Sequence, residues 1–169
     1  MPRYIAFLRG VSPMNAKMPE LRRCFESAGF TNVKTLLSSG NVVFDTRKSS
    51  EIALERKIQK ALAKDLSRTF DTFVRAVDHL RDLLDQDPYA EFNVPARAKR
   101  VITFLREAQK PKLPIAVDGA TIFTVKGREV FTAYLASPRG PVFMTLIEKT
   151  FGKEQTTRTL DTIRKCVAA

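Results

Sequence analysis

Short apolar runs and one amphipathic stretch define the start of the chain. Residues 4–8, with the sequence YIAFL, are β-rich and end at Arg9-Gly10, which predicts a strand. A helix is expected to begin near Pro19, because proline suits the first helical position. Apolar residues then recur at positions i, i+3, i+4 and i+7, which predicts one buried helix face formed by Leu21, Cys24, Phe25 and Ala28.

The first half continues with two strands, a helix and another strand. Strands are predicted over residues 33–36 and 41–44, on either side of the turn Ser38-Ser39-Gly40. A long helix is predicted over residues 50–66 and a strand over residues 72–77. The resulting order, β-α-β-β-α-β, is that of ferredoxin-like domains.

The second half repeats part of this pattern. Residues 100–106 read RVITFLR and resemble RYIAFLR at residues 3–9, while GREVF at residues 127–131 resembles GNVVF at residues 40–44. Two such matches in the same order favour an internal duplication. Between the copies lies a connector with a short helix around residues 80–84 and two breaks at prolines.

The second copy is the less regular one. Its crossover passes through Pro111 and Pro114, and its C-terminal part, residues 157–167, has a helical rather than a strand-like pattern. The remaining elements are expected as strands at 100–106, 121–125 and 129–135 and a helix near 140–151. The prediction is an α+β protein of two ferredoxin-like halves with a C-terminal helix: residues 1–78, a connector at 79–98, and residues 99–169.

Both faces of the predicted strands are apolar. In the first strand Tyr4, Ala6 and Leu8 alternate with Ile5 and Phe7. A single ferredoxin-like unit covers only one face of its sheet with helices. We therefore expect the second face to be covered as well, most simply by the other half of the chain.

Composition adds a strong positive charge to this picture. The 169 residues carry 29 Lys and Arg against 18 Asp and Glu, a net charge of +11 that is spread over both halves. Such a charge attracts phosphates and other anions, although solvated surface lysines would give the same balance. The N-terminus has no signal-peptide pattern, and two cysteines form no disulfide framework. The longest nearly unbroken apolar stretch is too short to cross a membrane, since it covers only residues 142–147. We therefore expect a cytoplasmic protein.

Several kinds of active site are excluded by spacing. The seven glycines are too far apart for a phosphate-binding P-loop or a dinucleotide fingerprint, and neither G-x-S-x-G nor C-x-x-C occurs. A single histidine, His79, excludes a multi-histidine metal site, and we expect no metal and no cofactor. Cys24 is expected in the core and Cys166 as the more exposed thiol. Phe7 and Phe44 are interpreted as core residues rather than as a platform for stacking RNA bases.

Polar and cationic residues are expected to lie together at one edge of the first predicted sheet. Strands one and three of a ferredoxin-like sheet are adjacent and antiparallel, so the end of the first meets the start of the third. The helix after the first strand begins at the same edge, where its backbone N–H groups favour an anion. The residues expected there are Arg9, Gly10, Lys17, Ser39, Gly40 and Asn41. The alternative is that Arg9 only caps the sheet edge and Gly40-Asn41 only forms a turn.

Four segments resemble the bacterial family known as domain of unknown function 1697: FLRGV at residues 7–11, the K-M-P-x-L-R pattern at 17–22, GFTNVKT at 29–35 and SGNVVF at 39–44. The segment around Thr157-Arg158 is similar to the family's C-terminal T-x-R-N-W-N-T-x-x-K segment, and Arg158 joins the candidate anion-binding residues. The resemblance implies a bacterial α+β protein with ferredoxin-like halves and no assigned activity. Ser12-Pro13-Met14-Asn15 replaces the family's glycine-rich N-V-G-G, which removes a candidate phosphate loop, and Thr159-Leu160-Asp161 replaces its Asn-Trp-Asn.

Three functions agree with these observations. The leading one is non-catalytic binding of an anionic ligand, a nucleotide or the phosphate of a nucleic acid. The second is an enzyme acting on a small phosphorylated or carboxylated metabolite at the same edge. The third is an interaction module that pairs with a protein through an apolar surface.

Overall fold

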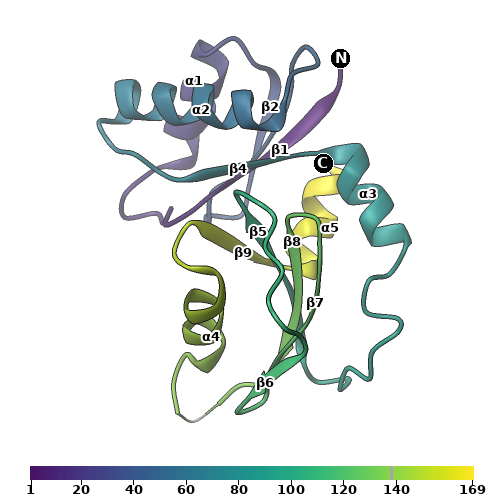
Figure 1. Cartoon of the computed structure of the whole chain (residues 1–169). Helices are drawn as coiled ribbons and strands as arrows, with labels where there is room; N and C mark the ends of the chain where they lie inside the picture. Colours follow the sequence, from purple (N-terminus) through teal and green to yellow (C-terminus); the bar gives the residue numbers. More distant parts are fainter. Residues whose placement is uncertain (138) are drawn as a thin grey trace. The chain divides into compact units, whose positions relative to one another are not determined.

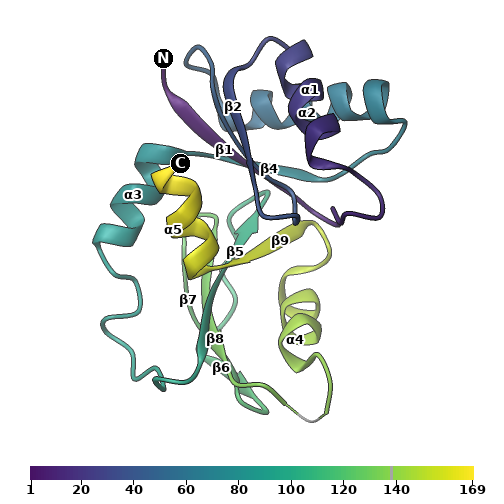
Figure 2. The same ribbon diagram turned by 180° about the vertical axis from the view of Figure 1, so that it is seen from behind.

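The computed structural model describes residues 1–137 and 139–169 of the chain. These residues form a mixed α+β structure with two antiparallel sheets and five helices (Figures 1 and 2). They divide into two compact units, Met1–Asp85 together with Ile163–Ala169, and Gln86–Thr162. None of the helices in the described part has the length and apolar character needed to cross a bilayer.

The first unit follows the predicted order of elements. Its antiparallel sheet has the strand order β2-β3-β1-β4, with α1 between β1 and β2 and α2 between β3 and β4. The strand predicted over 72–77 stops one residue earlier, because Val77 begins a helix. The elements are β1 (Arg3–Leu8), α1 (Met18–Ser27), β2 (Thr31–Leu36), β3 (Asn41–Asp45), α2 (Glu51–Leu66), β4 (Thr72–Ala76) and α3 (Val77–Asp85).

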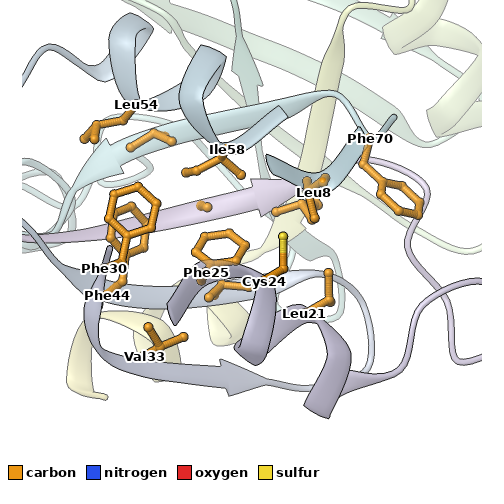
Figure 3. Packing of buried hydrophobic residues seen from close by; sticks show 14 of the residues in the cluster. Leu8, Leu21, Cys24, Phe25, Phe30, Val33, Phe44, Leu54, Ile58 and Phe70 are labelled. Carbon is orange, nitrogen blue, oxygen red and sulfur yellow. The ribbon is translucent and has the colours of Figure 1, made fainter. Parts of the chain in front are cut away.

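The core of this unit lies between the sheet and the pair of helices α1 and α2 (Figure 3). The predicted stripe of α1 is buried there, since Leu21, Cys24 and Phe25 all belong to the core cluster. Phe44 is at its centre, with ring centroids of Phe30 and Phe25 at 4.5 and 5.6 Å. Ser50 caps the N-terminus of α2, because its Oγ accepts a hydrogen bond from Ala53 N at 3.1 Å.

The opposite face of the same sheet is also buried, as its apolar residues predicted. Ile5, Phe7, Val43 and Phe73 have no exposed surface. Helix α3, which directly follows β4, contacts both β1 and β4. The interpretation of Phe7 and Phe44 as core residues is therefore confirmed.

Strand β4 lies at the edge of the sheet, and side chains of α2 occupy its outward backbone N–H groups. Thr72 N donates to Gln59 Oε1 at 3.0 Å, Val74 N donates to Glu55 Oε2 at 2.9 Å, and Ala76 N donates to Glu51 Oε2 at 2.9 Å. An uncovered edge would offer these groups to a strand of another molecule. The helix thus closes this edge with its own side chains.

The second unit differs from its prediction in two elements. The strand β6 lies in the crossover between β5 and β7, where no regular element was predicted. Thr157–Thr159, predicted as helical, belong to strand β9, because β-branched threonines suit a strand and here pair with β5. The sheet order is β6-β7-β8-β5-β9, and the elements are β5 (Lys99–Leu105), β6 (Ile115–Val117), β7 (Ala120–Lys126), β8 (Glu129–Tyr134), α4 (Val142–Phe151) and β9 (Gln155–Thr159). The last helix, α5 (Leu160–Ala168), follows β9, and from Ile163 onward it belongs to the first unit.

The connector is held to this second sheet by Tyr89. Its buried hydroxyl lies 2.7 Å from the carbonyl oxygen of Val101 and 2.9 Å from that of Thr132. Burial raises the pKa of the phenol well above its usual range, while the positive charge of Arg100 acts in the opposite direction. The hydroxyl therefore stays protonated and serves as a structural group.

Four strands of the second sheet, β7-β8-β5-β9, have the same order and chain positions as β2-β3-β1-β4 of the first. The second sequence match, however, is out of register by one residue. Tyr4 pairs with Phe44, whereas its counterpart Val101 pairs with Thr132 rather than with Phe131. A slip of one residue places a side chain on the other face of the sheet. Phe44 and Phe131 therefore do not correspond, although their strands do.

A further repeat appears at the last strand of each sheet. Arg75 on β4 pairs with Ile5, and Arg158 on β9 pairs with Ile102, the counterpart of Ile5. Both arginines donate from Nη1 to the preceding carbonyl at 2.9 Å. From each of these arginines, the spacing R-x-x-D-x-x-R continues into the helix that follows, at residues 75–81 and 158–164.

Both cysteines are buried thiols that form no disulfide. Cys24 lies in the core as expected, and burial together with the neighbouring Asp65 raises the pKa of its thiol to about 11. The expectation that Cys166 is the exposed thiol is wrong, because its exposed fraction is 0%. The last helix is a packed element rather than a frayed terminus.

Candidate functional site

The structure brings the end of β1 and the start of β3 together, as the strand order predicted. Leu8 N donates to Gly40 O at 2.8 Å, and Phe7 pairs with Asn41 in the sheet. Arg9 is held from its other side, since its backbone N donates to Asp71 O at 2.8 Å. Arg9, Ser39, Gly40 and Asn41 therefore share one edge of the first sheet.

Gly40 fits this edge because it has no side chain. Its φ of +82° is in the left-handed region. A Cβ atom at this position would lie 2.9 Å from Val11 Cβ and 3.0 Å from Leu8 O. The close approach of the turn to the loop after β1 depends on this glycine.

Replacing Gly40 with alanine is expected to lower the free energy of unfolding by about 1–3 kcal/mol, because the backbone strain adds to the collision with Val11. Urea unfolding followed by circular dichroism measures this change. Gly127→Ala is the matched control, since Gly127 has a φ of +62° and open space around its Cβ position. Equal losses in both variants would contradict a role for the close packing.

The loop from Gly10 to Lys17 has a defined conformation. The Asn15 side chain donates from Nδ2 to Gly10 O at 2.8 Å, and its Oδ1 accepts from Ser12 N at 2.9 Å. Val11 and Ala16 are buried, which anchors the loop to the core at two points. A single asparagine side chain thus shapes this loop, which has no glycine between Val11 and Lys17.

The start of α1 contributes less positive potential than the sequence suggested. Lys17 precedes the helix in an extended conformation and makes no capping bond with its side chain. Pro19 has no N–H group, and the carboxylate of Glu20 lies in the same first turn. The helix terminus therefore adds little, and an anion at this edge would depend on the side chains of Arg9 and Lys17.

Asn41 has a structural task within the turn. It is fully buried, and its Nδ2 donates to Leu36 O and to Ser39 Oγ, both at 3.0 Å. Ser39 itself is exposed. Ser38 and Ser39 are thus the exposed polar residues of the turn, and Ser39 is the one that Asn41 contacts.

Arg158, the last candidate residue, belongs to the second unit. Its Nη1 donates to Thr156 Oγ1 at 2.7 Å and to Thr157 O at 2.9 Å. These bonds fold the guanidinium back along its own strand. Within the first unit, the structure thus brings the chain around Arg9 and Gly10 next to the turn at Ser39, Gly40 and Asn41, whereas Lys17 lies at the far end of the loop, directly before α1.

A buried charged pair is the feature that the sequence reasoning missed. Glu55 and Arg75 are 2% and 0% exposed, and Glu55 Oε2 lies 3.7 Å from Arg75 Nη1. The spacing of Glu51, Glu55 and Gln59 by four residues on one helix was the available signal, because it places three acceptors on one face. Over the residues described, no group of three His, Cys, Asp or Glu side chains has the geometry of a metal site.

Comparisons with known proteins agree with this architecture. A search of curated proteins found no significant match. Among solved structures, the conserved bacterial protein SP0830 from Streptococcus pneumoniae is similar, with a TM-score of 0.71 and 19% identity over 99% of this chain and 97% of that chain. At this identity the likeness concerns the fold alone. The family model described as protein of unknown function DUF1697 matches residues 1–131, and the chain therefore belongs to that family, as its N-terminal segments indicated.

Proposed function

We propose that this protein binds an anionic ligand, a nucleotide or the phosphate of a nucleic acid, and does not catalyse a reaction on it. The ligand would lie at the edge formed by Arg9, Gly10, Lys17, Ser39, Gly40 and Asn41, with Arg158 as a further candidate from the second unit. The observation that supports this most is the bond from Leu8 N to Gly40 O, which joins the segments carrying Arg9 and Ser39. The net charge of +11 supplies the long-range attraction for such a ligand.

The binding chemistry follows from the side chains. The guanidinium of Arg9 is suited to two parallel hydrogen bonds with phosphate oxygens, and the ammonium of Lys17 adds a point charge. The hydroxyl of exposed Ser39 adds a donor that orients the ligand. We also propose a cytoplasmic location, supported by the two cysteines that form no disulfide.

Isothermal titration of the full chain with nucleotides and with a short RNA, at two salt concentrations, tests this function. Binding that weakens steeply with salt is expected, because phosphate contacts release counterions. The double variant Arg9→Ala/Lys17→Ala should lose at least about tenfold in affinity, given the strength of charged hydrogen bonds. The control is Arg47→Ala/Lys48→Ala, which removes the same charge just after the opposite end of β3.

Three outcomes would count against the proposal. Absence of binding at low salt would remove it. An equal loss of affinity in both double variants would mean that overall charge, and not this edge, attracts the ligand. Turnover of a bound nucleotide or metabolite would replace the binding protein with an enzyme at the same edge.

We further propose that the chain is a duplication of a ferredoxin-like unit, with copies in residues 1–78 and 99–169 and a connector at 79–98. The matching orders β2-β3-β1-β4 and β7-β8-β5-β9 support this origin. The corresponding positions of Arg75 and Arg158 support it independently of the first strands. The R-x-x-D-x-x-R spacing shared by residues 75–81 and 158–164 supports it as well.

A further inference from the structure

A cavity of about 650 Å³ lies between β6 and α4 in the second unit. Its walls come from the edge strand on one side and one flank of the helix on the other (Figures 1 and 2 show both elements). Volumes of roughly 300–1,000 Å³ are typical of sites for small molecules. The residues that matter most for its chemistry are Ile115, Val117, Val142, Thr145, Leu146 and Lys149.

The cavity exists because the second unit lacks a helix that the first unit has. On the first sheet α1 and α2 pack against each other. In the second unit the corresponding crossover, between β5 and β7, contains β6 and no helix among its described residues 106–119. One flank of α4 is therefore left without a neighbouring helix, and the cavity follows this flank.

The floor of the cavity is apolar. Leu146 is buried in the core of the second unit, and Ile115 and Val142 are half-buried against the same core. Val117 lines the same cavity and is 41% exposed. An aliphatic chain bound in this cavity would remove these side chains from water.

The charge of the cavity is concentrated at one end. At the other end Arg139 Nη1 lies 3.4 Å from Asp118 Oδ2, so these two charges offset each other. Lys149 lines the cavity seven residues after Val142, about 10 Å along the helix axis, and makes no ion pair within the described part of the chain. An apolar cavity with the ammonium of Lys149 at one end suits a ligand that has an aliphatic body and a single anionic head.

We propose that this cavity binds a medium-chain aliphatic carboxylate. Its chain lies on Ile115, Val142 and Leu146, and its carboxylate meets the ammonium of Lys149. This site belongs to the second unit and is separate from the edge that carries Arg9 and Lys17 in the first. A helix of a partner protein would cover the same floor, but it would not require a single cation at one end.

Isothermal titration of the full chain with decanoate, decanol and decyltrimethylammonium, each below its micelle concentration, tests the proposal. Decanoate is expected to bind at one site per chain and at least about fivefold more tightly than decanol, because the charged head adds a charge-assisted contact. Decyltrimethylammonium should bind most weakly. The Arg9→Ala/Lys17→Ala variant should bind decanoate like the wild type, which separates this site from the anion site.

Two pairs of variants locate the ligand. Lys149→Ala should reduce the affinity for decanoate to that for decanol, whereas Lys64→Ala, which removes an exposed charge from the first unit, should have no effect. Thr145→Trp should abolish binding by filling the cavity from an exposed helix position, and Thr145→Ser should preserve it. Thermal unfolding of each variant confirms that the fold is intact.

The proposal fails if wild-type protein binds none of the three compounds, an outcome that would leave the cavity to a partner's helix. It also fails if Thr145→Trp binds decanoate as well as the wild type, because the ligand would then lie elsewhere. Equal binding of decanoate and decanol, with no effect of Lys149→Ala, would overturn the assignment of an anionic head.

Discussion

Replacement of Phe44 with alanine is expected to lower the free energy of unfolding by about 3–5 kcal/mol, the range for a large aromatic removed from a packed core. The ring of Phe44 has no exposed surface. It lies against Phe30 and Phe25, with centroid distances of 4.5 and 5.6 Å (Figure 3). The ring of Tyr4 lies 5.9 Å away on another side. Urea denaturation followed by far-ultraviolet circular dichroism measures the loss, and the midpoint should decrease accordingly.

The control for Phe44 is Ile52→Ala on α2. Ile52 is 47% exposed, so its truncation should change the stability by less than about 0.5 kcal/mol, as for most surface positions. A loss below about 1 kcal/mol in Phe44→Ala would mean that the surrounding aromatic rings collapse into the space, contrary to close packing of this core.

Glu55→Ala is expected to have an effect of similar size for a different reason. The carboxylate of Glu55 is 2% exposed, accepts a hydrogen bond from Val74 N at 2.9 Å and lies 3.7 Å from Arg75 Nη1. Removing it leaves a fully buried guanidinium without this partner and a backbone N–H without its acceptor. The expected loss of unfolding free energy is about 3–5 kcal/mol, as for one member of a buried ion pair.

Glu55→Gln separates the two contributions. The amide oxygen of glutamine can still accept the bond from Val74 N, but it has no charge for Arg75. Chemical denaturation should therefore rank the wild type above Glu55→Gln, and Glu55→Gln above Glu55→Ala. If the glutamine and alanine variants lose the same stability, the hydrogen bond to β4 contributes nothing.

The first half of the fold could be predicted from the sequence because its signals agree with one another. The stripe of α1, the turn at Ser39-Gly40 and the apolar strands all point to the same order of elements, and both faces of the sheet are buried as expected. In the second half, β6 has three residues and follows prolines, so local pattern did not distinguish it from a loop. Thr157–Thr159 were assigned to a helix because the strand signal lies in their pairing with β5, which a local pattern does not contain.

The sequence predicted that the end of β1 and the start of β3 lie together at the candidate edge, but it did not predict the hydrogen bonds made there. The pairing of Phe7 with Asn41 follows from strand order, and the structure has it. The structural use of the Asn41 amide depends on the carbonyl of Leu36, which local sequence did not connect to it. The Glu55–Arg75 contact joins a helix and a strand twenty residues apart, and no spacing within either element indicates the partner.

The side chains that close β4 set a limit on how α2 can change. Four residues of a helix advance about 6 Å along its axis. Two residues of an antiparallel strand advance about 6.8 Å, so the three hydrogen bonds from β4 to side chains of α2 remain nearly matched along the two elements. Insertion of one residue between Glu51 and Gln59 would rotate one or more of the acceptor side chains by about 100° around the helix axis, away from β4. Insertions and deletions between Glu51 and Gln59 are therefore expected to break these hydrogen bonds, whereas substitutions on the solvent side of the helix leave them in place.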